Sequence, residues 1–179
     1  MIDFLLVLAV LLTVVLVVSL FMQLRMPIQY VPTPDIVVRA MIENANLCPG
    51  QTVYDLGAGD GRVLVAAKRA CPDIHAIAVE YVPTVYLFGR LISKLRGADI
   101  EWRWGAMQKQ DLRDADVIFV YLCNDLMQQL EQKFASEFTL GTRVISHAFQ
   151  LPHVKPIDVV EVKRGKRLYV YEWTVDSGK

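Results

Sequence analysis

The sequence is poor in cysteine and carries no net charge: it has three cysteines, 19 basic and 19 acidic residues. An odd cysteine count without a C-x-x-C pair gives no basis for a disulfide framework or a metal site, and a reducing compartment is the simplest setting. Balanced charge removes the electrostatic reason to expect nucleic-acid binding. The hydrophobic share of 54% exceeds the usual ~45–50% and excludes a disordered or low-complexity chain.

One stretch lacks charge altogether: residues 4–22 contain 17 apolar residues out of 19, and the exceptions are Thr13 and Ser19. At about 1.5 Å per residue such a helix reaches roughly 28 Å, close to the ~30 Å hydrocarbon core of a bilayer. A cleavable signal peptide would need a basic start, a shorter apolar run and a small-residue cleavage site. A buried core helix would keep a polar face. Residues 1–25 are therefore predicted to be an uncleaved transmembrane anchor.

The flanking charges predict how this anchor is oriented. Arg25 and Arg39 follow the apolar run and no basic residue precedes it. The positive-inside rule then places the rest of the chain on the cytoplasmic, or topologically equivalent, face of a single-pass protein. Residues 26–34 hold three prolines and predict an extended connector. Residues 35–179 are long enough for one domain with one core.

Short β-rich runs alternate with helical segments through this domain. Helices are expected at 35–47, 61–70, 83–96 and 124–138, and strands at 52–56, 74–80, 100–104, 116–122 and 142–147. Two last strands, 157–163 and 167–175, read as a hairpin. Strand–helix alternation with apolar strands favours a parallel sheet covered on both faces and wound by right-handed crossovers. The expected class is α/β, a doubly wound, mostly parallel Rossmann-like sheet with an antiparallel C-terminal hairpin.

A glycine-rich turn, Val53-Tyr-Asp-Leu-Gly-Ala-Gly-Asp-Gly-Arg62, is the sharpest chemical signal. Its three glycines allow a tight turn and a close approach of the backbone to a ligand. The turn joins the first strand to its helix, which is the edge of an open α/β sheet where ligands bind. Its G-x-G-x-G spacing differs from the dinucleotide pattern G-x-G-x-x-G, and no Walker G-K-[ST] is present.

Carboxylates around the turn indicate which ligand it serves. Asp55 and Asp60 would repel a pyrophosphate but suit S-adenosylmethionine, which carries a sulfonium and an ammonium and no phosphate. Glu80 ends the second strand, 19 residues after Gly61, where a carboxylate can accept both ribose hydroxyls. The residues themselves therefore predict an S-adenosylmethionine site made of Asp55, Gly57, Ala58, Gly59, Asp60, Gly61 and Glu80.

This motif, with its strand-two acid, resembles motif I of the class I (seven-β-strand) S-adenosylmethionine-dependent methyltransferases. Three further stretches extend the resemblance: Tyr30–Val38, Asp111–Val117 and Gly141–Phe149. They are similar to the ATP synthase c-subunit lysine N-methyltransferase family and its small prokaryotic relatives, over roughly residues 30–152. The resemblance implies a seven-strand methyltransferase fold and protein-lysine N-methylation.

The resemblance also adds residues to the cofactor site. In this family the connector folds over the cofactor, which implicates Tyr30 and Thr33. The family usually has an acid after strand three for the adenine amino group, whereas this chain has Gly105-Ala106-Met107. Adenine recognition is then left to backbone groups, to packing of Met107, or to Asp111.

Methyl transfer leaves little trace of catalytic residues, because the enzyme mainly aligns the acceptor with the methyl group and excludes water. Tyr, Asn or carbonyl groups can orient a neutral amine whose pKa is lowered by burial. Candidates at the strand ends are Tyr121, Asn124 and His147. Each also has a plain structural explanation: a packed strand aromatic, a helix cap, and a residue that closes strand five.

The sequence thus predicts a membrane-anchored S-adenosylmethionine-dependent methyltransferase, and the resemblance implies a lysine of a membrane or membrane-proximal protein as acceptor. A lipid or small lipophilic acceptor is the alternative, and a membrane-tethered scaffold with the same fold is the non-enzymatic one. The retained carboxylates and glycines argue against the scaffold, and the glycine spacing argues against a nicotinamide dehydrogenase. Strand four ends Tyr121-Leu-Cys-Asn124, without the Asn/Asp-Pro-Pro-Tyr motif, so no nucleic-acid substrate is expected.

Overall fold

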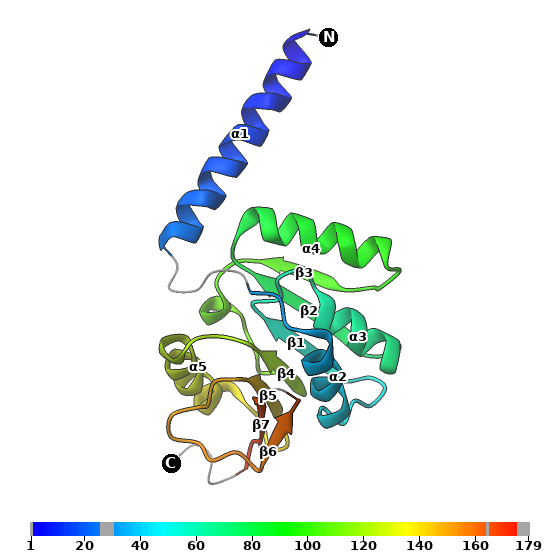
Figure 1. Ribbon diagram of the computed structural model, residues 1–179, viewed down its shortest axis with the longest axis vertical. Helices are drawn as coiled ribbons and strands as arrows, with labels where there is room; N and C mark the ends of the chain where they lie inside the picture. The colour runs from blue at the N-terminus through cyan, green and yellow to red at the C-terminus, as the bar shows by residue number, and fades with distance from the viewer. Residues whose placement is uncertain (1, 26–30, 164, 175–179) are drawn as a thin grey trace.

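Seven strands form one sheet in the order β3-β2-β1-β4-β5-β7-β6 in the computed structural model, which describes residues 2–25, 31–163 and 165–174 (Figure 1). The first five strands pair in parallel, and β7 lies antiparallel between β5 and β6. The strands are β1 Thr52–Leu56, β2 His75–Glu80, β3 Glu101–Trp104, β4 Val117–Val120, β5 Arg143–His147, β6 Asp158–Val162 and β7 Lys166–Glu172. The predicted α/β class with a parallel sheet and an antiparallel hairpin is confirmed.

Helices cover both faces of this sheet, as the apolar strands require. These covering helices are α2 Asp35–Asn44, α3 Arg62–Ala70, α4 Pro83–Leu95 and α5 Asn124–Glu137; the chain also has helix α1 Ile2–Arg25 and a 3₁₀ turn η1 Met107–Lys109. One core cluster joins the sheet to α2 and α3 through residues such as Met41 and Leu64. A second joins it to α5 through Met127, Leu130 and Phe134. Buried residues at helical spacing therefore produce the layers that the periodicity predicted.

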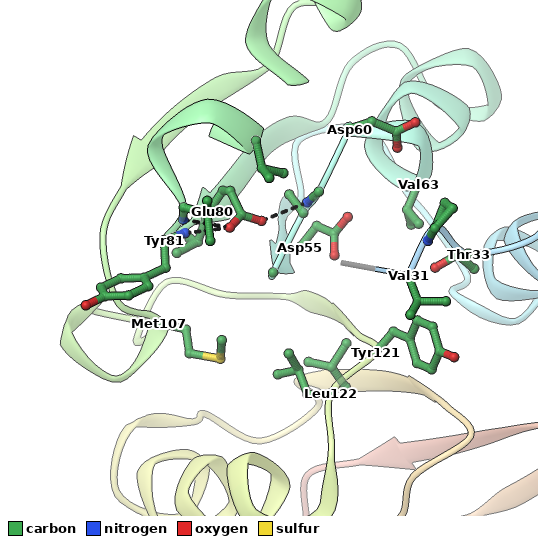
Figure 2. A pocket seen from close by; sticks show the side chains of 18 of the residues that line it. Val31, Thr33, Asp55, Asp60, Val63, Glu80, Tyr81, Met107, Tyr121 and Leu122 are labelled. Atoms are coloured by element: carbon green, nitrogen blue, oxygen red, sulfur yellow. Dashed lines mark hydrogen bonds between the residues drawn. The ribbon is translucent and has the colours of Figure 1, made fainter. Parts of the chain in front are cut away.

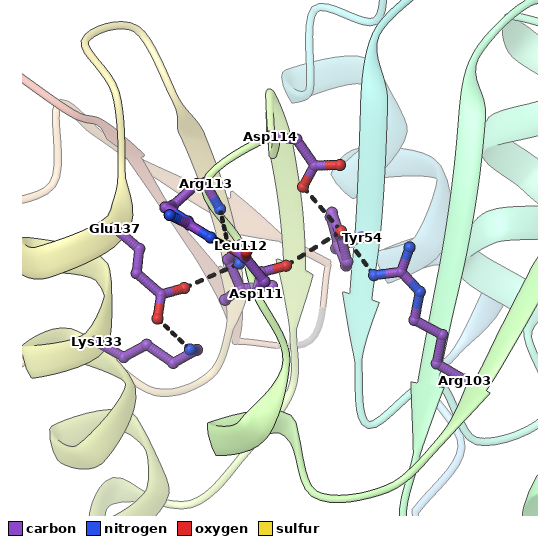
Figure 3. Close-up of polar contacts among 8 residues, drawn as sticks. All are labelled: Tyr54, Arg103, Asp111, Leu112, Arg113, Asp114, Lys133 and Glu137. Atoms are coloured by element: carbon purple, nitrogen blue, oxygen red, sulfur yellow. Dashed lines mark hydrogen bonds and ion pairs between the residues drawn. The ribbon is translucent and has the colours of Figure 1, made fainter.

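The crossover between β3 and β4 has only η1 in place of a helix, and a polar network holds it against the sheet (Figure 3). The buried Tyr54 hydroxyl donates to Asp114 at 2.9 Å and accepts from Arg103 at 3.0 Å. Two residues before Asp114, the Leu112 amide donates to Glu137 at 2.9 Å. Burial and the bond to Asp114 raise the pKa of Tyr54 to about 12, so the hydroxyl keeps the proton that it donates.

Helix α1 projects from the domain and contacts α4 (Figure 1). Within it, Asp3–Met22 is long and apolar enough to cross a membrane, and 6% of that stretch is buried against the protein. Such exposure is not that of a core helix. Of the predicted connector, residues 26–30 lie outside the described part of the chain, and Val31–Pro34 lead without regular structure into α2.

Candidate cofactor and acceptor site

A cavity of about 320 Å³ opens at the carboxyl ends of β1, β2 and β4 (Figure 2). The connector, the glycine turn, the start of α4 and η1 complete its wall. Eight of the predicted site residues line it: Thr33, Asp55, Gly57, Ala58, Gly59, Asp60, Glu80 and Tyr121. The parallel sheet brings these together because it places the ends of all its central strands at one edge.

The glycine turn needs its glycines for backbone geometry. Gly57, Gly59 and Gly61 all have positive φ, at 85°, 59° and 75°, a region that other residues rarely adopt. The amides of Gly57 and Ala58 donate to the Val79 carbonyl at 2.9 and 3.0 Å, which fastens the turn to β2. Gly61 begins α3 and does not line the cavity, so its role is in the turn itself.

Glu80 is held by three backbone amides at the end of β2. One carboxylate oxygen accepts from Gly59 at 3.1 Å, and the other accepts from Tyr81 and Val82 at 2.9 Å each. Burial raises the pKa of Glu80, and these three amides work against that rise. The network ties the cavity end of β2 to the glycine turn, and it orients a carboxylate that lines the cavity.

Asp55 presents the opposite case, a buried carboxylate with no donor. It is 5% exposed and lines the cavity, yet among the described residues no group donates a hydrogen bond to it. Burial raises its pKa to about 8, and the charges of Glu80 and Asp60 add to the rise. A buried polar group without a partner is costly, so Asp55 is suited to a cationic, hydrogen-bond-donating ligand.

Asp60 lines the cavity and is paired with a neighbouring cation. Arg62 binds both of its carboxylate oxygens, at 2.9 and 2.8 Å, and donates to the Thr33 carbonyl at 3.0 Å. Burial alone would raise the pKa of Asp60, but the hydrogen bonds and charge of Arg62 outweigh it and lower the pKa. The ion pair thus fastens the connector over the glycine turn, whereas Asp55 and Glu80 have no basic side chain bonded to them within the described residues.

On the predicted acceptor side, Tyr121 lines the cavity and packs against two other rings. The ring centroids lie 4.2 Å from His147 and 6.2 Å from Phe149. His147 is 3% exposed, lies behind Tyr121, and is not part of the cavity wall. Burial lowers the pKa of His147 to about 4, with a contribution from Lys166, and its Nδ1 has no hydrogen-bond partner within the described residues. The imidazole is therefore neutral at pH 7.

Besides Gly61 and His147, two predicted residues, Asn124 and Asp111, do not line the cavity. Asn124 is an exposed residue in the first turn of α5, whose N-cap position is taken by Cys123. Asp111 is exposed and pairs with Arg113 in the β3–β4 loop (Figure 3). Tyr30 lies outside the described residues. Met107, by contrast, does line the cavity, in keeping with the alternative that adenine packs against it.

Sequence reasoning missed two residues that shape the site. A Cβ on Gly89 of α4 would lie 2.5 Å from the Gly59 carbonyl oxygen and 2.3 Å from the Trp102 ring, so glycine lets α4 approach the turn. Phe149 reaches the cavity through Ala148, whose φ is 68°. A glycine inside a helix is a signal for the first. Nothing in the sequence marks Ala148, because a left-handed alanine is visible only in the backbone.

Comparison with known proteins identifies what this chain resembles. The family model described as "ANTKMT methyltransferase domain" matches residues 55–158. A protein-lysine N-methyltransferase of Saccharolobus islandicus is 30% identical over 85% of this chain and 96% of its own length. The adenine nucleotide translocase lysine N-methyltransferase of Mus musculus is 33% identical over 76% of this chain, which spans 60% of the mouse protein.

Solved structures agree with these matches. The crystal structure titled as an RNA methyltransferase from Salinibacter ruber, in complex with S-adenosyl-L-homocysteine, superposes with a TM-score of 0.77. It is 30% identical, and the match covers 82% of this chain and 95% of that one. A precorrin-6y C5,15-methyltransferase from Geobacter metallireducens, at 16% identity and a TM-score of 0.69, shares the fold.

Proposed function

Because this chain belongs to the ANTKMT methyltransferase family, we propose that it methylates lysine side chains of a protein held at or in a membrane. The resemblance seen in the sequence is thereby confirmed, and with it methyltransferase activity and S-adenosylmethionine as the cofactor. Lysine as acceptor is proposed from the names of the archaeal and mouse relatives. The observation that carries the proposal is a single cavity that joins donor-free Asp55 and anchored Glu80 to an aromatic wall.

The residues present fit this cofactor. Asp55 offers a buried carboxylate without a donor of its own, which matches an ammonium group, and Glu80 is oriented to accept ribose hydroxyls. The glycine turn leaves room for close approach of the backbone, and Met107 offers an apolar surface. When bound there, S-adenosylmethionine supplies an electrophilic methyl group on a sulfonium.

The wall around Tyr121 would bind and desolvate the acceptor lysine. Tyr121, Phe149 and Leu126 enclose the cavity near the end of β4, where they exclude water and lower the pKa of an entering lysine ammonium. The Tyr121 hydroxyl orients the neutral amine. Neutral His147, packed 4.2 Å behind the tyrosine ring, positions that ring. No strong base is needed, because desolvation lowers the pKa of the lysine ammonium, which then releases its proton to solvent water before the neutral amine attacks the methyl group.

The apolar helix α1 is proposed to span the membrane and to hold the domain at the cytoplasmic, or topologically equivalent, face. Support comes from its length and hydropathy and from its lack of cover by the protein. Tethering would raise the effective concentration of a bilayer-resident acceptor relative to a free one.

The test is radiolabelled methyl transfer by the full-length chain in nanodiscs. Membrane protein, lipid extract and RNA are offered separately, the last because the Salinibacter ruber structure is titled an RNA methyltransferase. We expect label in protein, released as methyl-lysine on acid hydrolysis, and much less label with Glu80→Gln at low S-adenosylmethionine concentration. Tyr121→Phe should lower kcat while leaving the affinity for S-adenosylmethionine unchanged. Label confined to lipid or RNA would replace the lysine proposal, and binding without turnover of any acceptor would favour a scaffold.

A further inference from the structure

Helix α4 carries an apolar face that the rest of the described protein leaves open. Its outer side forms an apolar stripe made of Leu87, Phe88, Leu91 and Leu95, which are between 52% and 73% exposed. These residues recur at the spacing of one helix face. Trp104, 62% exposed, lies beside the start of the helix, where its ring nitrogen donates to the Tyr81 carbonyl at 2.9 Å. A stripe of this kind on a surface helix marks an interaction site.

The charged residues of the α4 segment are all basic. Arg90, Lys94 and Arg96 are exposed on or just after α4, and no acidic residue occurs between Tyr81 and Ala98. An apolar face flanked by basic side chains is the composition of helices that lie in the interface of an anionic membrane. A partner protein surface would need an acidic, apolar groove of matching length, whereas a bilayer offers both properties everywhere.

The contact between α1 and α4 favours a bilayer over a partner protein as the occupant of the apolar stripe. Ser19 of α1 is 2% exposed, and its hydroxyl accepts from the Thr84 amide at 3.2 Å. That amide belongs to the first turn of α4, where a helix has unsatisfied donors, and no side chain of α4's own N-cap residue satisfies it. Helix α1 thus caps α4, and the start of α4 is fixed beside Ser19 along the length of α1.

This contact lies near the C-terminal end of the apolar run of α1. Ser19 lies three residues before Met22, the last residue of the run, which is about 4–5 Å along a helix. Amphipathic helices settle roughly 5–10 Å into the boundary between headgroups and acyl chains. Figure 1 shows α4 along the side of the domain that faces α1, crossing the direction of that helix. If α1 spans the bilayer, the start of α4 lies at interfacial depth.

We propose that the apolar stripe of α4 lies in the interface of an anionic phospholipid bilayer, beside the point where α1 enters it. This inference rests on the proposed anchor. The cavity wall includes Tyr81, Val82 and Val85 at the start of α4. The docked helix therefore holds the cavity near the membrane surface, and the acceptor is a lysine close to the membrane–water boundary of its own protein.

The experiment is photo-crosslinking of the full-length chain in nanodiscs of phosphatidylcholine with or without phosphatidylglycerol. A benzophenone side chain is introduced at Leu91, and in separate variants at Leu12 of α1 and at Gln128 on the exposed side of α5. We expect lipid adducts at positions 12 and 91 and none at 128, and a higher yield at 91 when phosphatidylglycerol is present. Adducts at 12 without adducts at 91 would overturn the docking and leave the anchor intact.

Two further outcomes separate the remaining possibilities. An adduct between two chains at position 91 would assign the stripe to a second copy and also overturn the proposal. Lipid adducts at neither 12 nor 91 would remove the anchor and the docking together. Arg90→Glu with Lys94→Glu should lower the yield at 91 several-fold in anionic nanodiscs only. Arg69→Glu with Lys155→Glu makes the same charge change elsewhere on the exposed surface and should leave the yield unchanged.

Discussion

Replacing Gly89 by alanine separates local helix preference from the tertiary contact that the structure shows. By helix propensity alone, alanine is favoured over glycine by ~1 kcal/mol in a helix interior. In this structure, however, the new Cβ would lie 2.5 Å from the Gly59 carbonyl oxygen and 2.3 Å from the Trp102 ring. The two considerations predict opposite signs for the change in stability.

The ring cannot easily move away from the added methyl group. Trp102 Nε1 donates to the Ser93 hydroxyl at 3.0 Å, and the Tyr86 ring packs edge-on against it at 5.9 Å. Gly59 belongs to the backbone of the cofactor turn, and its own amide donates to Glu80. Overpacking a core costs roughly 1–3 kcal/mol. With the upper part of that range set against the propensity gain, we expect a net loss of about 1–2 kcal/mol.

The same displacement should weaken cofactor binding, because the atom that is pushed belongs to the cavity wall. A shift of the Gly59 peptide disturbs the bond to Glu80, and a loss of ~1.4 kcal/mol in binding corresponds to a tenfold higher Kd. We would measure urea unfolding and calorimetric binding of S-adenosylhomocysteine by the full chain in mild detergent. In a Trp102→Leu background the loss of stability should shrink, whereas the weaker binding should remain because the carbonyl contact is still there.

A matched control measures the propensity difference in this protein. Gln128 is exposed on α5, so Gln128→Ala should be more stable than Gln128→Gly by ~1 kcal/mol. If Gly89→Ala is as stable as the parent protein, or more stable, and binds S-adenosylhomocysteine equally well, the close contact between α4 and the glycine turn is refuted.

Three further predictions concern the carboxylates. Glu80→Gln should weaken S-adenosylmethionine binding by about 10–150-fold, the worth of a charged hydrogen bond of ~1.5–3 kcal/mol; calorimetry finding less than about a threefold change would contradict this role. Asp55, whose pKa rises to about 8, is protonated when folded but ionised when unfolded, so its stabilising contribution declines as pH rises towards 8. His147, whose pKa falls from 6.5 to about 4, makes stability rise with pH up to about 6.5, so it offsets the effect of Asp55 in that range. The decline should therefore appear between about pH 6.5 and 8 in urea titrations of the ligand-free protein and flatten in Asp55→Asn. Arg62→Met should speed amide hydrogen exchange at Val31 and Thr33 by releasing the connector, and unchanged exchange would show that other contacts hold it.

The sequence was sufficient for the fold and for the placement of Asp55 and Glu80 at one cavity, because both depend on short-range patterns. Strand–helix periodicity predicted a parallel sheet, and a parallel sheet necessarily brings the ends of β1 and β2 to one edge. Asp55 and Glu80 could therefore be paired without knowing any side-chain contact. The same logic holds for Tyr121, which ends the neighbouring strand β4 and does line the cavity.

Residues on loops and helices were harder to place, because long-range contacts orient them. Asp111 follows strand three in sequence, yet the network around Tyr54 and Asp114 fixes the loop so that it is exposed. Asn124 comes four residues after the end of β4, and the helix begins before its side chain can turn to the cavity. The motif alone made every acidic residue in the turn a candidate ligand. It therefore did not predict that Asp60 pairs with Arg62, only two residues away.

Helix α4 connects the three parts of the molecule that a membrane-bound transferase must coordinate. Its first turn is capped by Ser19 of α1, its middle lies against the cofactor turn at Gly89, and Val85 belongs to the cavity wall. Because α4 is one continuous helix of 13 residues, its tilt at the proposed membrane surface would be linked to the position of the glycine turn. The proposed docking therefore places two requirements on α4. An apolar stripe on its outer side would set its depth in the membrane, and a glycine on its inner side lets it pack against the glycine turn of the cavity.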